Sequence, residues 1–348
     1  MLPNLNAAMG YLKQLVASSV QHNASHLYCV VGQPPAIKRL GHIEFLQARK
    51  IEKEDIENII SGVLPTEAQA ALHSTGEAST STAFDETHSL SIHAARDISR
   101  PESETKITIC IKELVLPSEG DVPQELICTV MSASRGVILL GGAAHHNKDA
   151  TVRFLLHKIA STQRKHILTF GFGAIAPAGS SNSIISSYSL SQANFSFIKN
   201  QAADILAFPE LDHNLARIAR DCAATGILTI AAIDSVSTPC MLERVIALFP
   251  DRTSGINFLS SHVLGTVMQA LLTKGPCIYI YDFIKFEDKV REVINSGNTA
   301  LVEDSGMVEQ INKLIDENKL TYSDAQPILA HIAGGTGAQY TNEVNGEF

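Results

Sequence analysis

The pattern of apolar and polar positions divides the chain into two parts. Up to residue 113, short runs of alternating apolar and polar residues follow one another, with helical spacing at residues 4–20 and 52–61. Alternation is typical of strands with one buried face, and spacing by three and four residues is typical of amphipathic helices. The first part is therefore predicted to be a small α+β domain.

Continuous apolar runs replace this alternation in the second part. They occur in the segments GVILL, HILTF, DILAF, ILTIAAI and CIYIYDF, and helical segments separate them. Strands that are apolar throughout suit a parallel sheet covered on both faces. Residues 116–124 carry two prolines and a glycine, which indicate a boundary. We predict one domain over 1–114, a linker over 115–124 and an α/β domain over 125–348.

Composition and charge exclude several classes of function. The 348 residues are 45% hydrophobic and 18% charged, which is typical of a soluble globular protein with room for two cores. The net charge of −9 gives no basic surface for nucleic acid, and no apolar run reaches the roughly 20 residues of a membrane span. The six cysteines lack C-x-x-C spacing. We expect a cytoplasmic protein without direct membrane insertion.

The segment GVILLGGAAHHNKDA has the outline of a phosphate-binding loop with altered chemistry. In the motif G-x-x-x-x-G-K-[ST], the glycines let backbone N–H groups approach phosphate oxygens. Gly142 is at the first glycine position of this motif and Lys148 is at the lysine position. Asn147 replaces the second glycine, and Asp149 replaces the hydroxyl residue. His145 and Asn147 tolerate left-handed backbone geometry. These five residues are the candidate nucleotide-binding set, in a loop whose shape is expected to survive better than its cavity.

Asp149 leaves several uses of this loop open. A carboxylate about 4 Å from a phosphate charge costs roughly 4 kcal/mol at an effective dielectric near 20, about a thousandfold in affinity. Either Asp149 binds a cation and bridges to the phosphate, or the segment is an ordinary strand–turn–helix with a solvated lysine. A metal site built from His145, His146 and Asp149 is not expected, because adjacent loop side chains rarely point at one ion.

No Asp or Glu occurs from Ala150 through Ala203. Phosphoryl transfer to water requires a group that positions the water and ligands that hold Mg²⁺. The next acids are Asp204, a possible Mg²⁺ ligand, and Glu210, a candidate catalytic base. The alternative is that Asp204 merely begins a strand and that Glu210 is an exposed acid in a turn.

Six blocks keep the order and spacing of one protein family: ASHLYCVVGQPPAIKRLGHI, RGVILLGG with its lysine, HILTF, ADILAFPELD, ATGILTIAAIDSVSTPCMLERVIALFP and residues 287–320. Together they resemble the type IV pilus retraction ATPases, the PilT/PilU branch of the secretion ATPases. The resemblance implies a PAS-like N-terminal domain joined to a RecA-like P-loop core. It also implies a cytoplasmic hexamer that uses ATP and Mg²⁺ to pull on pili at the inner-membrane platform.

The chain differs from this family at the positions that bind and hydrolyse the nucleotide. The loop lacks its second glycine and its Ser/Thr, and the acidic box after HILT is replaced by a segment that begins at Phe170 and Gly171. The family's histidine is Asp234, and its arginine-bearing strand reads Ser89–His93. The resemblance therefore implies a PilT-like motor subunit for twitching or retraction that is impaired in ATP hydrolysis. Such a subunit would act structurally or as a regulator, in a homo-hexamer or in a mixed ring with an active paralogue.

Two other functions remain open on the same architecture. One is an active but atypical ATPase, in which Lys148, Asp149 or Asp204 acts at the metal site and Glu210 is the catalytic base. The other is a non-catalytic module that binds a nucleotide or another anion through Lys148 and the neighbouring histidines.

Overall fold

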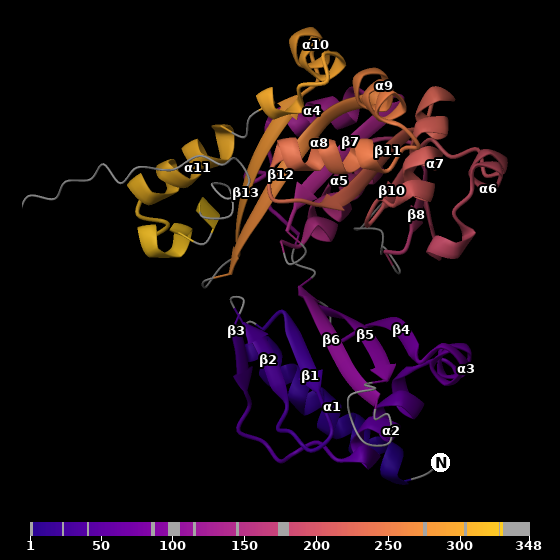
Figure 1. Cartoon of the computed structure of the whole chain (residues 1–348), viewed down its shortest axis with the longest axis vertical. Coiled ribbons are helices and arrows are strands. Elements are labelled where there is room, and N and C mark those ends of the chain that lie inside the picture. The colour runs from indigo at the N-terminus through magenta and orange to yellow at the C-terminus, as the bar shows by residue number, and fades with distance from the viewer. Residues whose placement is uncertain are drawn as a thin grey trace, which may run out of the picture. The chain divides into compact units, whose positions relative to one another are not determined.

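The computed structural model describes residues 3–22, 24–39, 42–84, 88–96, 105–113, 116–143, 146–172, 181–273, 277–302, 305–326 and 328–329. The chain forms two compact units, Met1–Val115 and Leu116–Phe348 (Figure 1). Among the helices within the described ranges, none is long and apolar enough to cross a membrane.

The first unit is a six-stranded antiparallel sheet with helices packed on one face. Its strands, in the order β3-β2-β1-β6-β5-β4, are β1 (His26–Cys29), β2 (Ala36–Arg39), β3 (His42–Phe45), β4 (Glu77–Ala83), β5 (His88–Arg96) and β6 (Thr105–Glu113). Its helices are α1 (Pro3–Gln21), α2 (Lys53–Val63) and α3 (Thr66–Thr75). Leu27 of β1 and Ile109 of β6 are fully buried in one core with Val16 of α1. The predicted helices at 4–20 and 52–61 correspond to α1 and α2.

The other face of this sheet carries exposed apolar side chains. Phe45 lies opposite Ala36, which lies opposite Tyr28 on the next strand. Since directly paired residues point to the same side of a sheet, Phe45 shares the face of Tyr28 and not the buried face of Leu27. Phe45 is 62% exposed, and Ile43 on the same side of β3 is 58% exposed.

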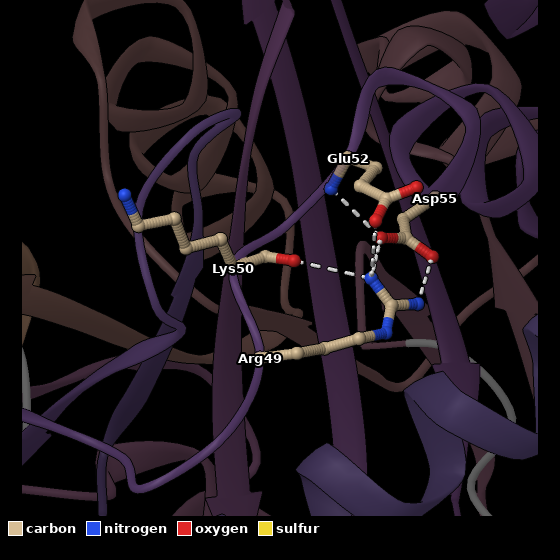
Figure 2. Close-up of polar contacts among 4 residues, drawn as sticks. All are labelled: Arg49, Lys50, Glu52 and Asp55. Atoms are coloured by element: carbon tan, nitrogen blue, oxygen red, sulfur yellow. Dashed lines mark hydrogen bonds and ion pairs between the residues drawn. The ribbon is translucent and has the colours of Figure 1, made fainter.

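A polar cluster joins the segment before α2 to the first turn of α2 (Figure 2), and Arg49 of this cluster also contacts Tyr11 of α1. The Arg49 guanidinium donates to both carboxylate oxygens of Asp55 at 2.6 and 2.7 Å and lies 4.4 Å from the centre of the Tyr11 ring. The backbone N–H of Glu52 donates to Asp55 Oδ2 at 2.8 Å, which caps the start of α2. The hydrogen bonds from Arg49 lower the pKa of Asp55.

Arg49→Ala is expected to destabilise the first unit by about 1 kcal/mol at neutral pH, because it removes the ion pair with Asp55 and leaves the hydrogen bond from the Glu52 N–H in place. A carboxyl with a lowered folded-state pKa stabilises the fold above its unfolded pKa, and this contribution disappears as pH falls through the folded pKa. The free energies of unfolding of wild type and variant, measured in urea, should therefore converge in acid. Lys50→Ala, which keeps the Lys50 carbonyl that also accepts from Arg49, is the control; a deficit that persists unchanged in acid would contradict the assignment.

The second unit contains a seven-stranded sheet in the order β13-β12-β7-β11-β10-β8-β9, parallel except for β13. The strands are β7 (Gly136–Gly142), β8 (His166–Phe170), β9 (Ile184–Tyr188), β10 (Ile205–Phe208), β11 (Leu228–Asp234), β12 (Val263–Thr273) and β13 (Cys277–Lys285). Every residue of β7 is buried. A strand buried along its whole length needs cover on both faces, as its apolar sequence predicts.

Helices supply this cover (Figure 1). They are α4 (Gln124–Ser132), α5 (Lys148–Thr162), α6 (Phe195–Asn200), α7 (His213–Ala224), α8 (Thr238–Ala247), α9 (Arg252–His262), α10 (Asp288–Asn295) and α11 (Ser305–Asp316). Ile138 and Leu140 of β7 pack into a core with α4 and α5, whereas Val137 and Leu139 join the core of α7, α8 and α9. The loop between β7 and α5 therefore lies at the carboxyl end of a central strand.

Candidate functional site

The candidate loop lies where open α/β sheets usually bind their ligands. Gly142 is the last residue of β7, Lys148 is the first residue of α5, and β7 pairs with β11 on one side and β12 on the other. The register places Asp234, the last residue of β11, beside Gly142. The loop thus has the carboxyl ends of two neighbouring parallel strands on its flanks.

The amino group of Lys148 is fully engaged within the protein. Its Nζ lies 2.6 Å from Asp234 Oδ1 and donates to the carbonyl oxygens of Gly142 and Ala143 at 3.0 Å each. An ammonium group has three donors, and these three acceptors use them all. The Lys148 side chain is 7% exposed and that of Asp234 is 35% exposed. The charge that a P-loop lysine offers to phosphate is here neutralised by a carboxylate.

The loop keeps part of the expected backbone shape. Asn147 adopts φ 52° and ψ 43°, the left-handed conformation that its place in the motif requires. A Cβ on Gly142 would lie 2.6 Å from the Gln269 carbonyl oxygen, so only glycine permits the close approach of β12. His145 lies outside the described residues, and His146 is buried.

Gln269 of β12 ties the loop to the sheet. Its Nε2 donates to the His146 carbonyl at 2.6 Å, and its Oε1 accepts from Thr151 Oγ1 at 2.7 Å. The Gln269 carbonyl lies 3.1 Å from His146 Nδ1. Gln269 is 1% exposed. A buried amide with these partners fixes the loop firmly, since losing any of them would leave a buried polar group unpaired.

Two tyrosines of β13 complete the network. Tyr279 Oη accepts from Asn147 Nδ2 at 3.2 Å, and Tyr281 Oη lies 2.8 Å from Thr151 Oγ1. Burial raises the pKa of Tyr281, which keeps its hydroxyl neutral. The sequence signals for these partners were one amide inside the apolar run VMQALL and alternating tyrosines in CIYIYDF. Neither signal was predicted to belong to the site.

The cavity beside the loop is very small. It measures about 20 Å³ and is lined by Gly142, Ala143 and His146, by residues of β11–α8 and β12, and by Met307 and Ile328. This volume holds about one water molecule, whereas small-molecule pockets commonly measure about 300 Å³ or more. This cavity is therefore too small to hold a nucleoside triphosphate.

Asp204 lies at the opposite end of the sheet. It precedes β10, and its Oδ2 accepts from the His166 backbone N–H at 2.8 Å, at the start of β8. The first residue of β10 is level with the starts of β11 and β7. At about 3.3 Å per strand residue, Asp204 is roughly 20 Å from the loop. A Mg²⁺ ion at Lys148 is therefore out of its reach, and the strand-start alternative describes its position.

Glu210 lies at the same end of the sheet as the loop but does not join it. It is exposed and follows β10, where the next residue, Leu211, donates its N–H to the Ala232 carbonyl at 2.9 Å. In the strand order β7-β11-β10 it is two strands from the loop, about 10 Å. The structure does not bring it into contact with Lys148.

The position of the family's acidic box is a tight turn. Gly171 has φ 78°, donates its N–H to the Tyr188 carbonyl at 2.9 Å, and has no space for a side chain because a Cβ would lie 2.8 Å from Leu190 Cγ. The next residue, Phe172, is buried and accepts a hydrogen bond from Arg153 through its carbonyl. This turn supplies no carboxylate to the loop.

The donor set around the loop does not fit a magnesium-bound nucleotide. Asp149 lies in the first turn of α5, in place of the hydroxyl ligand. Its negative charge interacts favourably with the N-terminus of the helix, which is the position that a phosphate would otherwise occupy. Within the described ranges, no group of three His, Cys, Asp or Glu side chains converges to hold a metal ion.

Known proteins identify the architecture. No protein-family model matches the chain. It is 21% identical to the type IV pilus retraction ATPase PilT of Pseudomonas aeruginosa over 300 residues, 83% of this chain and 86% of that protein. The crystal structure of the pilus retraction motor PilT with bound ADP superposes with a TM-score of 0.69 at 18% identity, over 91% of this chain and 96% of that one.

The X-ray structure of the Legionella pneumophila ATPase DotB superposes with a TM-score of 0.70 at 14% identity, over 92% of this chain and 95% of that one. These superpositions extend over both units, and they confirm the predicted RecA-like α/β core preceded by a smaller α+β domain. In sequence the chain is therefore similar to PilT, and in fold it is similar to both PilT and DotB.

Proposed function

We propose that the chain is a PilT-like subunit of a type IV pilus motor that is impaired in ATP hydrolysis and acts structurally or as a regulator. Similarity to PilT over most of both sequences supports the link to pili. The observation that carries the loss of hydrolysis is the engagement of Lys148 Nζ by Asp234, Gly142 and Ala143. A lysine held in this way does not neutralise charge on the β- and γ-phosphates.

The other parts of a hydrolytic site are also displaced or replaced. Asp149 stands in place of the Mg²⁺-binding hydroxyl, Asp204 is roughly 20 Å away, and Gly171 occupies the acidic box. Of Asp204 and Glu210, only Glu210 lies at the same end of the sheet as the loop. An active ATPase, the alternative function, would need Lys148 released from Asp234 and Glu210 brought about 10 Å nearer.

Phosphate release tests this proposal. With millimolar ATP and Mg²⁺, the wild-type chain is expected to release no more phosphate than buffer alone, because neither the lysine nor a base is in place. Lys148→Ala and Glu210→Gln are expected to give the same background. Turnover by the wild type that either substitution abolishes would establish the atypical ATPase instead.

We further propose that the chain works in the cytoplasm within a ring, either a homo-hexamer or a mixed ring with an active paralogue, at the pilus inner-membrane platform. The exposed apolar pair Ile43 and Phe45, on the helix-free face of the first unit's sheet, supports contact with a second subunit.

Phe45→Glu is expected to weaken self-association at least tenfold, since burying a phenylalanine contributes about 1.5–3 kcal/mol. Analytical ultracentrifugation of the 37.5 kDa chain measures this effect. Glu44→Ala, also exposed on β3 but pointing to the other side, is the matched control. Equal association constants for wild type, control and Phe45→Glu would rule out this face as an interface.

A further inference from the structure

The C-terminal segment, defined as the described residues 305–326 and 328–329 of the second unit, packs beside the β7–α5 loop. Its helix α11 lies along β13 (Figure 1), and residues 322–326 form a further helical turn. Glu309, Asn312 and Lys313 are exposed on the outer side of α11, whereas Met307 and Ile311 are buried. Among the described elements, β13 is the principal neighbour of α11. The segment is therefore attached to the sheet along one side.

Side-chain hydrogen bonds attach this segment to β13. Asp282 Oδ2 accepts from the backbone N–H of Gly306 at 3.1 Å, at the start of α11. Gln310 Oε1 accepts from the backbone N–H of Tyr281 at 2.8 Å. A side-chain amide therefore satisfies a donor on the outermost strand of the sheet, which would otherwise be open to pairing with another chain. Tyr281 also belongs to the network that holds the loop.

The apolar side of the segment reaches the cavity at the loop. Met307 is 3% exposed and Ile328 is 7% exposed, and both pack into one core with Met268 of β12. The same two side chains line the cavity of about 20 Å³ together with Gly142 and Ala143. The segment therefore provides a wall of this cavity and limits its volume.

We propose that the C-terminal segment is an autoinhibitory plug, which keeps the cavity at the β7–α5 loop closed while it is packed and opens it on release. The segment contacts the sheet along one side and, within the described residues, supplies no strand to it, so its release exposes Met307 and Ile311 but leaves the strand pairing intact. Release removes Met307 and Ile328 from the cavity wall and frees the Tyr281 backbone N–H. The same event that opens the loop thereby also opens the β13 edge to a partner. The plug acts on access to the loop and does not depend on whether the chain hydrolyses ATP.

Hydrogen exchange measured by mass spectrometry, on the full chain without nucleotide, tests the plug. Met307→Ala with Gln310→Ala removes a cavity wall and a hydrogen-bond acceptor. We expect the amides of residues 146–151 to exchange at least tenfold faster than in wild type, with those of strand β10 unchanged. Glu309→Ala, on the exposed side of α11, is the matched control and should exchange as wild type does.

Equal exchange at residues 146–151 in wild type and double variant, with faster exchange within α11, would overturn the proposal. If the double variant also exposes β10, Met307→Ala alone decides by the same comparison, since it removes the cavity wall and keeps both hydrogen bonds. Because nucleotide is absent, the result is separate from the test of hydrolysis. Phosphate release by the wild type would overturn the proposed function and leave the plug standing.

Discussion

Asp234→Ala is expected to lower the free energy of unfolding of the second unit by about 2–3 kcal/mol. The substitution leaves the Lys148 ammonium, in a side chain only 7% exposed, with two carbonyl oxygens and no counter-charge. Removing one partner of a buried ion pair commonly costs 3–5 kcal/mol, and the 35% exposure of Asp234 reduces that figure. Denaturant unfolding, followed by a probe in the second unit, measures the loss.

A double-mutant cycle separates the ion pair from other effects of the substitution. Lys148→Leu combined with Asp234→Ala removes both charges, so the double variant should be more stable than the sum of the single losses predicts, by about 1–3 kcal/mol. Strictly additive losses would mean that the two side chains do not stabilise each other, in contradiction to the 2.6 Å contact.

Asp234→His is expected to raise affinity for ATP and Mg²⁺ at least tenfold. The substitution places the residue of the PilT-like family at the end of β11 and releases Lys148 from its carboxylate. It also removes one negative charge near the phosphate position, where a charge pair at about 4 Å is worth roughly 4 kcal/mol at an effective dielectric near 20. Asp149 remains in the first turn of α5 and limits the gain. Calorimetric titration is expected to show binding heat in the variant at submillimolar nucleotide, where the wild type shows none.

Asp234→His combined with Lys148→Ala is the control, and it should lose whatever affinity the single variant gains. If Asp234→His binds no more tightly than wild type, the ion pair is not what prevents nucleotide binding at this loop.

Local sequence spacing predicted the shape of the loop because the motif lies within a few residues. Neighbouring residues indicate that Gly142 ends a buried strand and that Lys148 begins a helix. They also indicate that Asn147 adopts a left-handed conformation. The cover of helices on both faces of the sheet was likewise predicted from strands that are apolar throughout.

Local sequence spacing could not predict which distant residues hydrogen-bond to the loop. Asp234 is 86 residues from Lys148, and Gln269 is 123 residues from His146. They meet because β7 lies between β11 and β12, and the order of strands in a sheet is set by long-range packing that no local pattern records. Asp204 illustrates the same point, since an acid at the start of a strand lies roughly 20 Å from one at its end.

The most direct test of the account is a calorimetric titration of the wild-type chain with ATP and Mg²⁺, beside Lys148→Ala. We expect no binding heat up to millimolar nucleotide in either protein, because the Lys148 ammonium already donates to Asp234 and to two backbone carbonyls. Micromolar binding by the wild type that Lys148→Ala abolishes would contradict it, and would show that Lys148 exchanges Asp234 for phosphate.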